Sequence, residues 1–269
     1  MDRVRLNWRE AGEGTALVLL HGFPLNSAQW EPQFANLPPG WRVIAPDLRG
    51  FGASSGGGDG PYTMDVFAAD VAALLDSLEV ERAVLCGVSM GGYVAFAFLR
   101  AFRARVLGLV LSDTRAGADS EQARAGRHAL AEKVGEDGAA AVREAMLPKL
   151  VSAATHRERP QVAAQVAAMV DVAPVDSLRR TLHGMAARPD SEPLLRTIEV
   201  PTLIVVGEDD EITPPGDAQL LARGIRGARL ELIRDAGHLP NLEQPARFDR
   251  ALHGFLGASF SQDALRFTL

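Results

Sequence analysis

The sequence has little of several features that would place it in other classes of protein. Its 269 residues include one cysteine, Cys86, so no disulfide can form within the chain. It has no run of Lys and Arg and a net charge of −6, which argue against nucleic acid or an anionic membrane surface as a partner. No window approaches the ~20 apolar residues of a membrane span. Residues 1–10 carry charges where a signal peptide needs apolar side chains. We therefore expect a cytoplasmic protein.

The chain is long and apolar enough for one large α/β domain, because 47% of its residues are hydrophobic and 23% are charged. Short apolar runs, typical of strands buried on both faces of a parallel sheet, alternate with helical patterns. These runs lie at 16–20, 41–45, 83–86, 106–111, 201–206 and 230–233. The segment 64–78 has apolar residues at helical spacing, and 4–8 has the alternation of an edge strand. The pattern predicts a doubly wound, mostly parallel sheet.

The alternation of strands and helices stops in the middle of the chain. Residues 117–197 contain no convincing strand, and their helical patterns lie at 120–134, 138–150, 159–172 and 175–187. We interpret 117–197 as a helical cap, or lid, inserted into a core made of residues 1–116 and 198–269. The inserted segment contains no Tyr, Trp or Phe.

The stretch Gly87–Gly92 carries the strongest chemical signal. It has the form G-x-S-x-G and stands between an apolar strand and a helical run. In this context a tight turn forces the serine into a strained backbone conformation, while small flanking residues let strand and helix pass each other. The hydroxyl of Ser89 is then exposed at a helix N-terminus, where developing negative charge is favoured. Ser89 is our candidate nucleophile.

A serine nucleophile needs a base and an acid that orients the base. His238 is the candidate base because it lies in a Gly- and Pro-bounded loop directly after the last predicted strand. The candidate acid is Asp210, in the loop after the strand 201–206. Its neighbour Asp209 is the nearest alternative, and Asp113, after the strand 106–111, is a displaced one.

The oxyanion formed by attack needs two backbone N–H donors. One is the amide of Met90, which follows the nucleophile in the chain. The other is expected from the loop 21–24, where Gly22 allows a close approach and Phe23 offers its amide. Pro24, which has no N–H, makes this loop more rigid.

Taken in order, these motifs resemble those of the α/β-hydrolase superfamily, in its serine esterase and lactonase-like branch. The matching segments are His21–Pro24, Asp47–Ser54, Gly87–Gly92, Gly207–Pro214 and Ala236–His238. The resemblance implies an eight-stranded core with a helical cap and a triad of Ser89, His238 and Asp210. In that family the acid stands three residues after the glycine that ends its strand, which favours Asp210 over Asp209.

The resemblance also implies the reaction: hydrolysis of a small or medium uncharged ester, lactone or thioester through an acyl-serine intermediate, with a small-molecule substrate and no metal or organic cofactor. Candidate residues of the acyl pocket are Met146, Leu150, Met169 and Met185. Two alternatives stay open. Cofactor-free haloperoxidases and perhydrolases share the triad, although they commonly carry Trp where this chain has Phe23. A non-catalytic small-ligand sensor could use the same scaffold.

Overall fold

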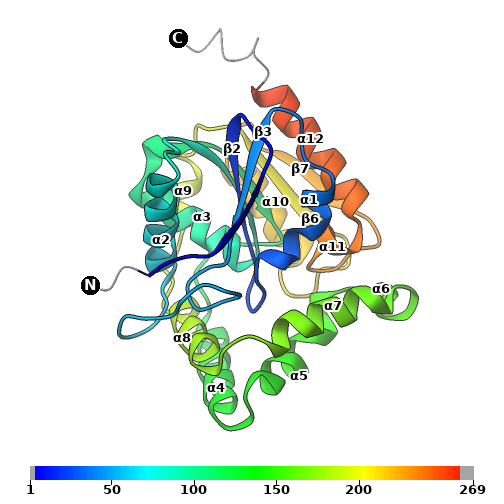
Figure 1. Cartoon of the computed structure of the whole chain (residues 1–269). Coiled ribbons are helices and arrows are strands. Elements are labelled where there is room, and N and C mark those ends of the chain that lie inside the picture. The colour runs from blue at the N-terminus through cyan, green and yellow to red at the C-terminus, as the bar shows by residue number, and fades with distance from the viewer. Residues whose placement is uncertain (1–3, 261–269) are drawn as a thin grey trace.

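A seven-stranded sheet forms the centre of the computed structural model, which describes residues 4–260 (Figure 1). Its order is β1-β3-β2-β4-β5-β6-β7. The strands are β1 (Trp8–Ala11), β2 (Thr15–Leu20), β3 (Trp41–Pro46), β4 (Ala83–Val88), β5 (Val106–Ser112), β6 (Thr202–Gly207) and β7 (Arg229–Ile233). β1 runs antiparallel to β3, and every other neighbouring pair is parallel. The predicted doubly wound, mostly parallel fold is confirmed.

The described sheet has seven strands, where the resemblance implied eight. Residues 4–7 were expected to start the edge strand, but the carbonyls of Arg5 and Asn7 accept isolated backbone hydrogen bonds from Ser55 and Asp47 in the loop after β3. A strand needs a repeating ladder of such bonds, so this segment follows the loop instead of joining the sheet. The edge strand starts at Trp8.

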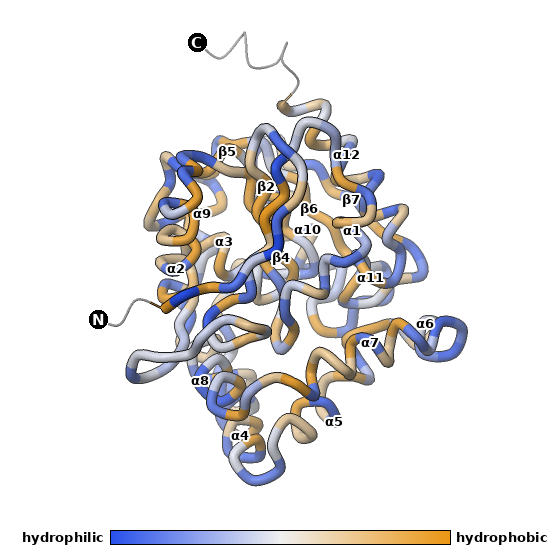
Figure 2. The backbone as a smooth tube through the Cα atoms, in the orientation of Figure 1, coloured by the Kyte–Doolittle hydropathy of each residue, from blue (hydrophilic) through white to orange (hydrophobic). Residues whose placement is uncertain are grey.

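Helices cover both faces of the sheet, which explains why its central strands are apolar on both sides (Figure 2). In Figure 1, α2, α3 and α9 lie to the left of the sheet, and α1 and α12 lie to its right. The bounds of the core helices are α1 (Glu31–Ala35), α2 (Met64–Ser77), α3 (Met90–Ala101), α10 (Pro215–Gly224), α11 (Pro240–Glu243) and α12 (Pro245–Phe260), with short 3₁₀ turns at Ser27–Trp30 and Arg103–Arg105.

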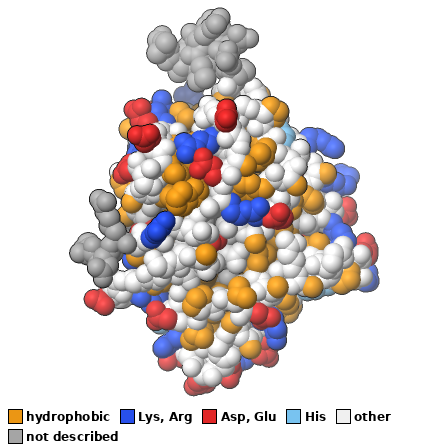
Figure 3. Space-filling view, viewed as in Figure 1, with side chains coloured by type: hydrophobic (Ala, Val, Ile, Leu, Met, Phe, Trp, Pro, Cys, Tyr) orange, Lys and Arg blue, Asp and Glu red, His pale blue; other side chains and the backbone are white. Residues whose placement is uncertain are grey.

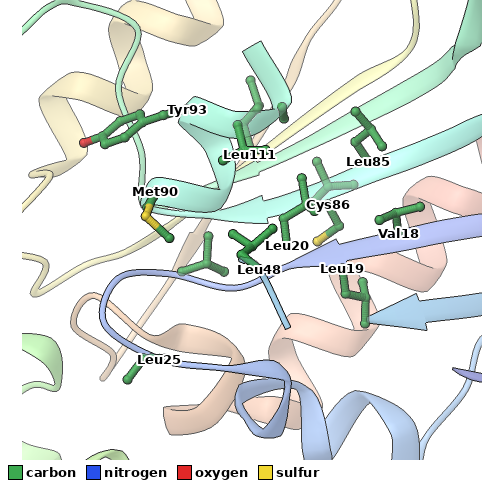
Figure 4. Close-up of a cluster of buried hydrophobic side chains, with 14 of the residues drawn as sticks. Val18, Leu19, Leu20, Leu25, Leu48, Leu85, Cys86, Met90, Tyr93 and Leu111 are labelled. Carbon is green, nitrogen blue, oxygen red and sulfur yellow. The ribbon is translucent and has the colours of Figure 1, made fainter. Parts of the chain in front are cut away.

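The single cysteine belongs to the hydrophobic core. Cys86 lies in β4 among buried side chains that include Leu19, Leu20 and Leu85 (Figure 4). Burial raises the pKa of the Cys86 thiol far above its ordinary value, because a thiolate would have no solvent there. Cys86 therefore packs as a small apolar residue and has no nucleophilic character.

The chain between β5 and β6 is helical. It forms α4 (Glu121–Asp137), α5 (Ala139–Leu150), α6 (Ala153–Glu158), α7 (Pro160–Asp171), α8 (Val175–Ala186) and α9 (Glu192–Leu195). Helices α4 to α8 lie together below the sheet in Figure 1, with α4 packed on α8 and α5 on α7. The side chains of Arg188 and Asp119, both 3% exposed, form an ion pair at the base of this helical segment. The division into core and cap at 117–197 stays a prediction, and the position of these helices agrees with it.

The surface shows no concentration of one charge on the face drawn in Figure 3, where acidic and basic side chains are interspersed. Between residues 4 and 260, no helix has the length and apolar character that spanning a membrane requires.

The contact between α3 and β2 yields a stability prediction. A methyl group on Gly91 would lie 2.1 Å from the carbonyl oxygen of Leu20, which is backbone and cannot move aside. We expect Gly91→Ala to lower the free energy of unfolding by about 3 kcal/mol or more. Gly126→Ala is the matched control, since a methyl group there meets no atom within 4 Å, and alanine in helix α4 should stabilise by up to about 1 kcal/mol. Urea denaturation followed by circular dichroism measures both. Equal effects would contradict the close contact.

Candidate active site

Ser89 occupies a strained turn between β4 and α3. Its backbone angles are φ 54° and ψ −113°, a conformation that non-glycine residues rarely adopt. Neighbouring groups hold it: the Ser89 amide donates to the carbonyl of Ser112 (2.9 Å), and the hydroxyl of Thr114 donates to the carbonyl of Ser89 (2.8 Å). The side chain is neither fully buried nor fully exposed, as a group that must meet a ligand requires.

The strand and helix around Ser89 approach so closely that only glycine fits between them. A methyl group on Gly87 would lie 2.3 Å from the carbonyl carbon of Gly91. This explains both glycines of the G-x-S-x-G pattern as packing requirements of the turn. α3 starts at Met90, directly after Ser89, and the amide of Gly92 donates to the carbonyl of Ser89 (2.9 Å).

The loop after β2 lies against the same turn. A Cβ atom on Gly22 would stand 3.5 Å from Cβ of Ser89. Within residues 4–260, the N–H groups of Phe23 and Met90 have no hydrogen-bond acceptor. Both are therefore available to a negatively charged oxygen beside Ser89, and their role as an oxyanion hole stays a prediction.

His21 fixes the loop that carries Phe23. Its Nε2 accepts a hydrogen bond from the amide of Leu48 (3.0 Å), so the ring hydrogen is on Nδ1, which donates to the carbonyl of Gly22 (3.0 Å). Burial lowers the pKa of His21, which keeps the ring in this neutral tautomer. The ring therefore acts as a bridge between the ends of β2 and β3.

His238 and Asp210 form a buried hydrogen-bonded pair. Nδ1 of His238 lies 2.8 Å from Oδ2 of Asp210, and both side chains are at most 1% exposed. Burial alone would raise the pKa of Asp210, but His238 and hydrogen bonds from Thr213 hold it below its ordinary value. An ionised carboxylate only accepts hydrogen bonds, so Nδ1 of His238 carries the hydrogen and Nε2 keeps a free lone pair.

The two alternative acids are placed differently. Asp209 is exposed and its amide donates to the carbonyl of Ala236, with no side-chain bond to His238. Asp113 is buried, and its carboxyl accepts hydrogen bonds from the amide of Gly207 (2.8 Å) and the hydroxyl of Ser112 (2.6 Å). Burial, followed by the negative charge of Asp210, raises the pKa of Asp113 well above its ordinary value. Asp113 is thus the weaker acid of the two buried carboxyls and lies behind the Asp210–His238 pair.

Asp113, Asp210 and His238 are the one group between residues 4 and 260 with the spacing of a metal site, since one ligand atom from each lies within 4.8 Å of the others. The carboxyl oxygens are already used as acceptors. Oδ1 of Asp210 accepts from the amides of Ile212 (2.8 Å) and Thr213 (3.0 Å), and Oδ2 accepts from His238 and the Thr213 hydroxyl. This pattern fits an acid that orients a histidine better than a set of metal ligands.

The predicted pocket residues lie in the helical segment. Leu150 and Met169 are buried, and Met146 is half-buried. Met185 is buried too, and its sulfur lies 3.5 Å from Nη1 of Arg127. Leu150 ends α5 directly before the chain that touches the His238 loop. Contact of these four residues with a substrate stays a prediction.

Three residues of the site received no role from the sequence: His21, Thr213 and Glu243. Thr213 follows Asp210 by three residues, a spacing at which an aspartate commonly accepts from the backbone ahead of it, so this signal was available. His21 accepts from the amide of Leu48, and Glu243 accepts from Ser152 and Thr155, all of them distant in the sequence. Contacts of this kind give the sequence no local pattern from which these roles could be predicted.

A family model of the α/β hydrolase fold matches residues 15–245, and the chain belongs to this family. A thermophilic esterase from Thermogutta terrifontis, solved with malate bound, is 42% identical and superposes with a TM-score of 0.91 over 94% of this chain and 93% of that one. The enol-lactonase of Burkholderia xenovorans LB400 is 29% identical, with a TM-score of 0.87 over 95% and 97% of the two chains.

Among characterised sequences, 3-oxoadipate enol-lactonase 2 of Acinetobacter baylyi is 31% identical over 94% of this chain and 93% of its own length. These similarities confirm the resemblance to the esterase and lactonase branch that the motifs indicated. The chain is therefore a hydrolase of the α/β fold.

The raised pKa of Asp113 predicts a pH-dependent stability. Above its ordinary value of 3.8 the carboxyl ionises in the unfolded chain while the native state keeps the proton. The native state then binds more protons, so the stability from this group is complete below 3.8 and is lost as the pH rises. We expect Asp113→Asn, which does not titrate, to gain stability over the wild type as the pH rises above 3.8.

Urea unfolding at several pH values measures this difference, with Asp59→Asn in an exposed loop as the matched control. A difference between Asp113→Asn and the wild type that does not change with pH would contradict a protonated Asp113.

Proposed function

We propose that this chain is a serine hydrolase that cleaves a carboxylic ester or lactone through an acyl-Ser89 intermediate. The observation that carries the proposal is the 2.8 Å hydrogen bond between His238 and Asp210, which leaves Nε2 of His238 free to accept a proton. The strained turn at Ser89 and the unpaired amides of Phe23 and Met90 support it.

The reaction proceeds in two halves. Nε2 of His238 takes the proton of the Ser89 hydroxyl as its oxygen attacks the carbonyl carbon of the substrate. The amides of Phe23 and Met90 donate to the oxyanion, and His238 then returns the proton to the departing alcohol oxygen. Water loses a proton to His238, attacks the acyl group and releases the acid, and Ser89 recovers its proton. Asp210 stabilises the imidazolium present in each half.

The substrate we propose is small or medium in size and uncharged around its acyl group. The relatives are named for ester and enol-lactone hydrolysis, and both substrates have a carbonyl that bears an oxygen leaving group. Arg127 and Arg188, which lie at the base of the helical segment, both pair with Asp119. Their charges are therefore already engaged, which supports an uncharged acyl group over one with a carboxylate.

Replacement of the nucleophile tests the reaction class. We expect Ser89→Ala to reduce hydrolysis of p-nitrophenyl esters on the order of 10⁵-fold, because no other group can form the acyl intermediate. Ser77→Ala, an exposed position at the end of α2, serves as the control and should keep full activity. Esters of graded acyl length would also define the pocket. Full activity of Ser89→Ala would exclude the mechanism, and tight ligand binding without turnover by the wild type would favour the sensor alternative.

Replacement of the acids tests the assignment of Asp210. Asp210→Asn should lower kcat about 10⁴-fold, because an amide facing Nδ1 favours the wrong tautomer of His238. Asp209→Asn should leave kcat unchanged, and Asp113→Asn should cost less than about tenfold, since neither side chain orients His238 in the native protein. Steady-state kinetics with one activated ester compares the three. A larger loss for Asp113→Asn than for Asp210→Asn would reverse the assignment.

A further inference from the structure

Glu243 is a buried acidic residue next to the site, at the end of α11 and 1% exposed. Both of its carboxyl oxygens accept hydrogen bonds, and the two oxygens face different parts of the molecule. One faces the loop that carries His238, and the other faces the helical segment between β5 and β6. No step of the proposed reaction uses this side chain.

On the core side, Oε1 of Glu243 accepts from the amide of Gly237 (2.8 Å) and from the amide of Leu239 (3.4 Å). These two residues flank His238 in the chain. The carboxylate thus fixes the peptide units on both sides of His238, and through them the direction in which the imidazole ring leaves the backbone.

On the other side, Oε2 of Glu243 accepts from the amide of Ser152 (2.8 Å) and the hydroxyl of Thr155 (2.7 Å). Ser152 is the N-cap of α6, and its own side chain accepts from the amide of Thr155 (3.1 Å). Nη2 of Arg159 also donates to the Thr155 hydroxyl (2.8 Å). The first turn of α6 is therefore anchored on Glu243.

The two sides are also in direct contact. A methyl group on Gly237 would lie 2.7 Å from the nitrogen of Ser152 and 3.1 Å from the carbonyl carbon of Val151. The connection between α5 and α6 consequently packs on the backbone of the His238 loop. A shift of either one changes the distance that the Glu243 carboxyl has to span.

We propose that Glu243 is a positioning residue that couples the connection between α5 and α6 to the orientation of His238. The inference rests on the proposed function, in which His238 is the base. A carboxylate suits this role because it accepts on both oxygens. An amide has one acceptor oxygen and a donor group, so Gln in this place can satisfy one side only.

The first experiment compares Glu243→Gln with Asp249→Asn. Asp249 is a buried acid in α12 that accepts from Gln33 (2.9 Å) and Asn36 (2.9 Å). It has no bond to the His238 loop, although Gln33 also donates to the carbonyl of Asn241 in α11. We expect Glu243→Gln to lower kcat on the order of 10- to 100-fold with little change in KM. Asp249→Asn should lower the thermal midpoint while kcat stays at the wild-type value.

The second experiment changes only the side of the helical segment. Thr155→Val removes one donor to Glu243 without changing a charge, and the control is Thr181→Val in α8. Thr181 is buried and its hydroxyl has no partner between residues 4 and 260, so its loss should have no effect. We expect Thr155→Val to lower kcat severalfold and to speed hydrogen–deuterium exchange of the amides of Gly237 and Leu239.

The exchange measurement needs no turnover, so it separates the two proposals. Unchanged exchange at Gly237 and Leu239 in Thr155→Val overturns the coupling, even if Ser89→Ala shows that the chain is a serine esterase. Equal losses of kcat in Glu243→Gln and Asp249→Asn also overturn it. Absence of ester hydrolysis by the wild type, together with faster exchange in Thr155→Val, overturns the proposed function and leaves the coupling in place.

Discussion

The site depends on one backbone constraint, the positive φ of 54° at Ser89. This conformation costs on the order of 1–3 kcal/mol and persists only where the surroundings hold it. Here β4 is in the middle of the sheet, the amide of Ser89 is bonded to the end of β5, and α3 starts at the next residue. Because a side chain at Gly87 or Gly91 would collide with backbone, the same turn dictates which residues can flank it. The serine hydroxyl is thus directed by the sheet and not by a flexible loop.

Electrostatics in the site separate two aspartates that stand close together. His238 and the N–H and O–H donors on both oxygens hold the pKa of Asp210 below its ordinary value, while burial and the charge of Asp210 raise the pKa of the neighbouring Asp113. Two negative charges at this spacing in a buried site would repel strongly, which favours a single ionised carboxyl. The charge that remains is the one hydrogen-bonded to His238. The protein therefore orients its histidine with a single carboxylate although two lie within reach.

Much of the fold could be read from the sequence, because β2 to β6 are apolar on both faces and helices α4, α5, α7 and α8 repeat their apolar residues at helical spacing. Local chemistry also located Ser89 and His238. The edge strand was predicted at 4–8 but lies at Trp8–Ala11. Its alternation of apolar and polar residues is weak, and its position is set by hydrogen bonds to β3, which is distant in the sequence. The short helix α6 and the role of Glu243 were not visible, because Glu243 bonds with Ser152 and Thr155 across about ninety positions of sequence. Hydrogen bonds of that kind leave no periodic pattern.

The placement of the helical segment has a consequence for protein engineering. The segment leaves β5 at Ser112 and returns at Thr202 on the neighbouring strand, so exchanging it with that of a relative would preserve the register of the sheet. A chimera made in this way still inherits Glu243 from the recipient core. The donor segment must bring two hydrogen-bond donors to the positions of Ser152 and Thr155, or it leaves a buried carboxylate half satisfied at a cost of about 1–3 kcal/mol. Because the donor at Ser152 is a backbone amide, which every residue except proline supplies, compatibility between segment and core can be screened at the position of Thr155 before any chimera is made.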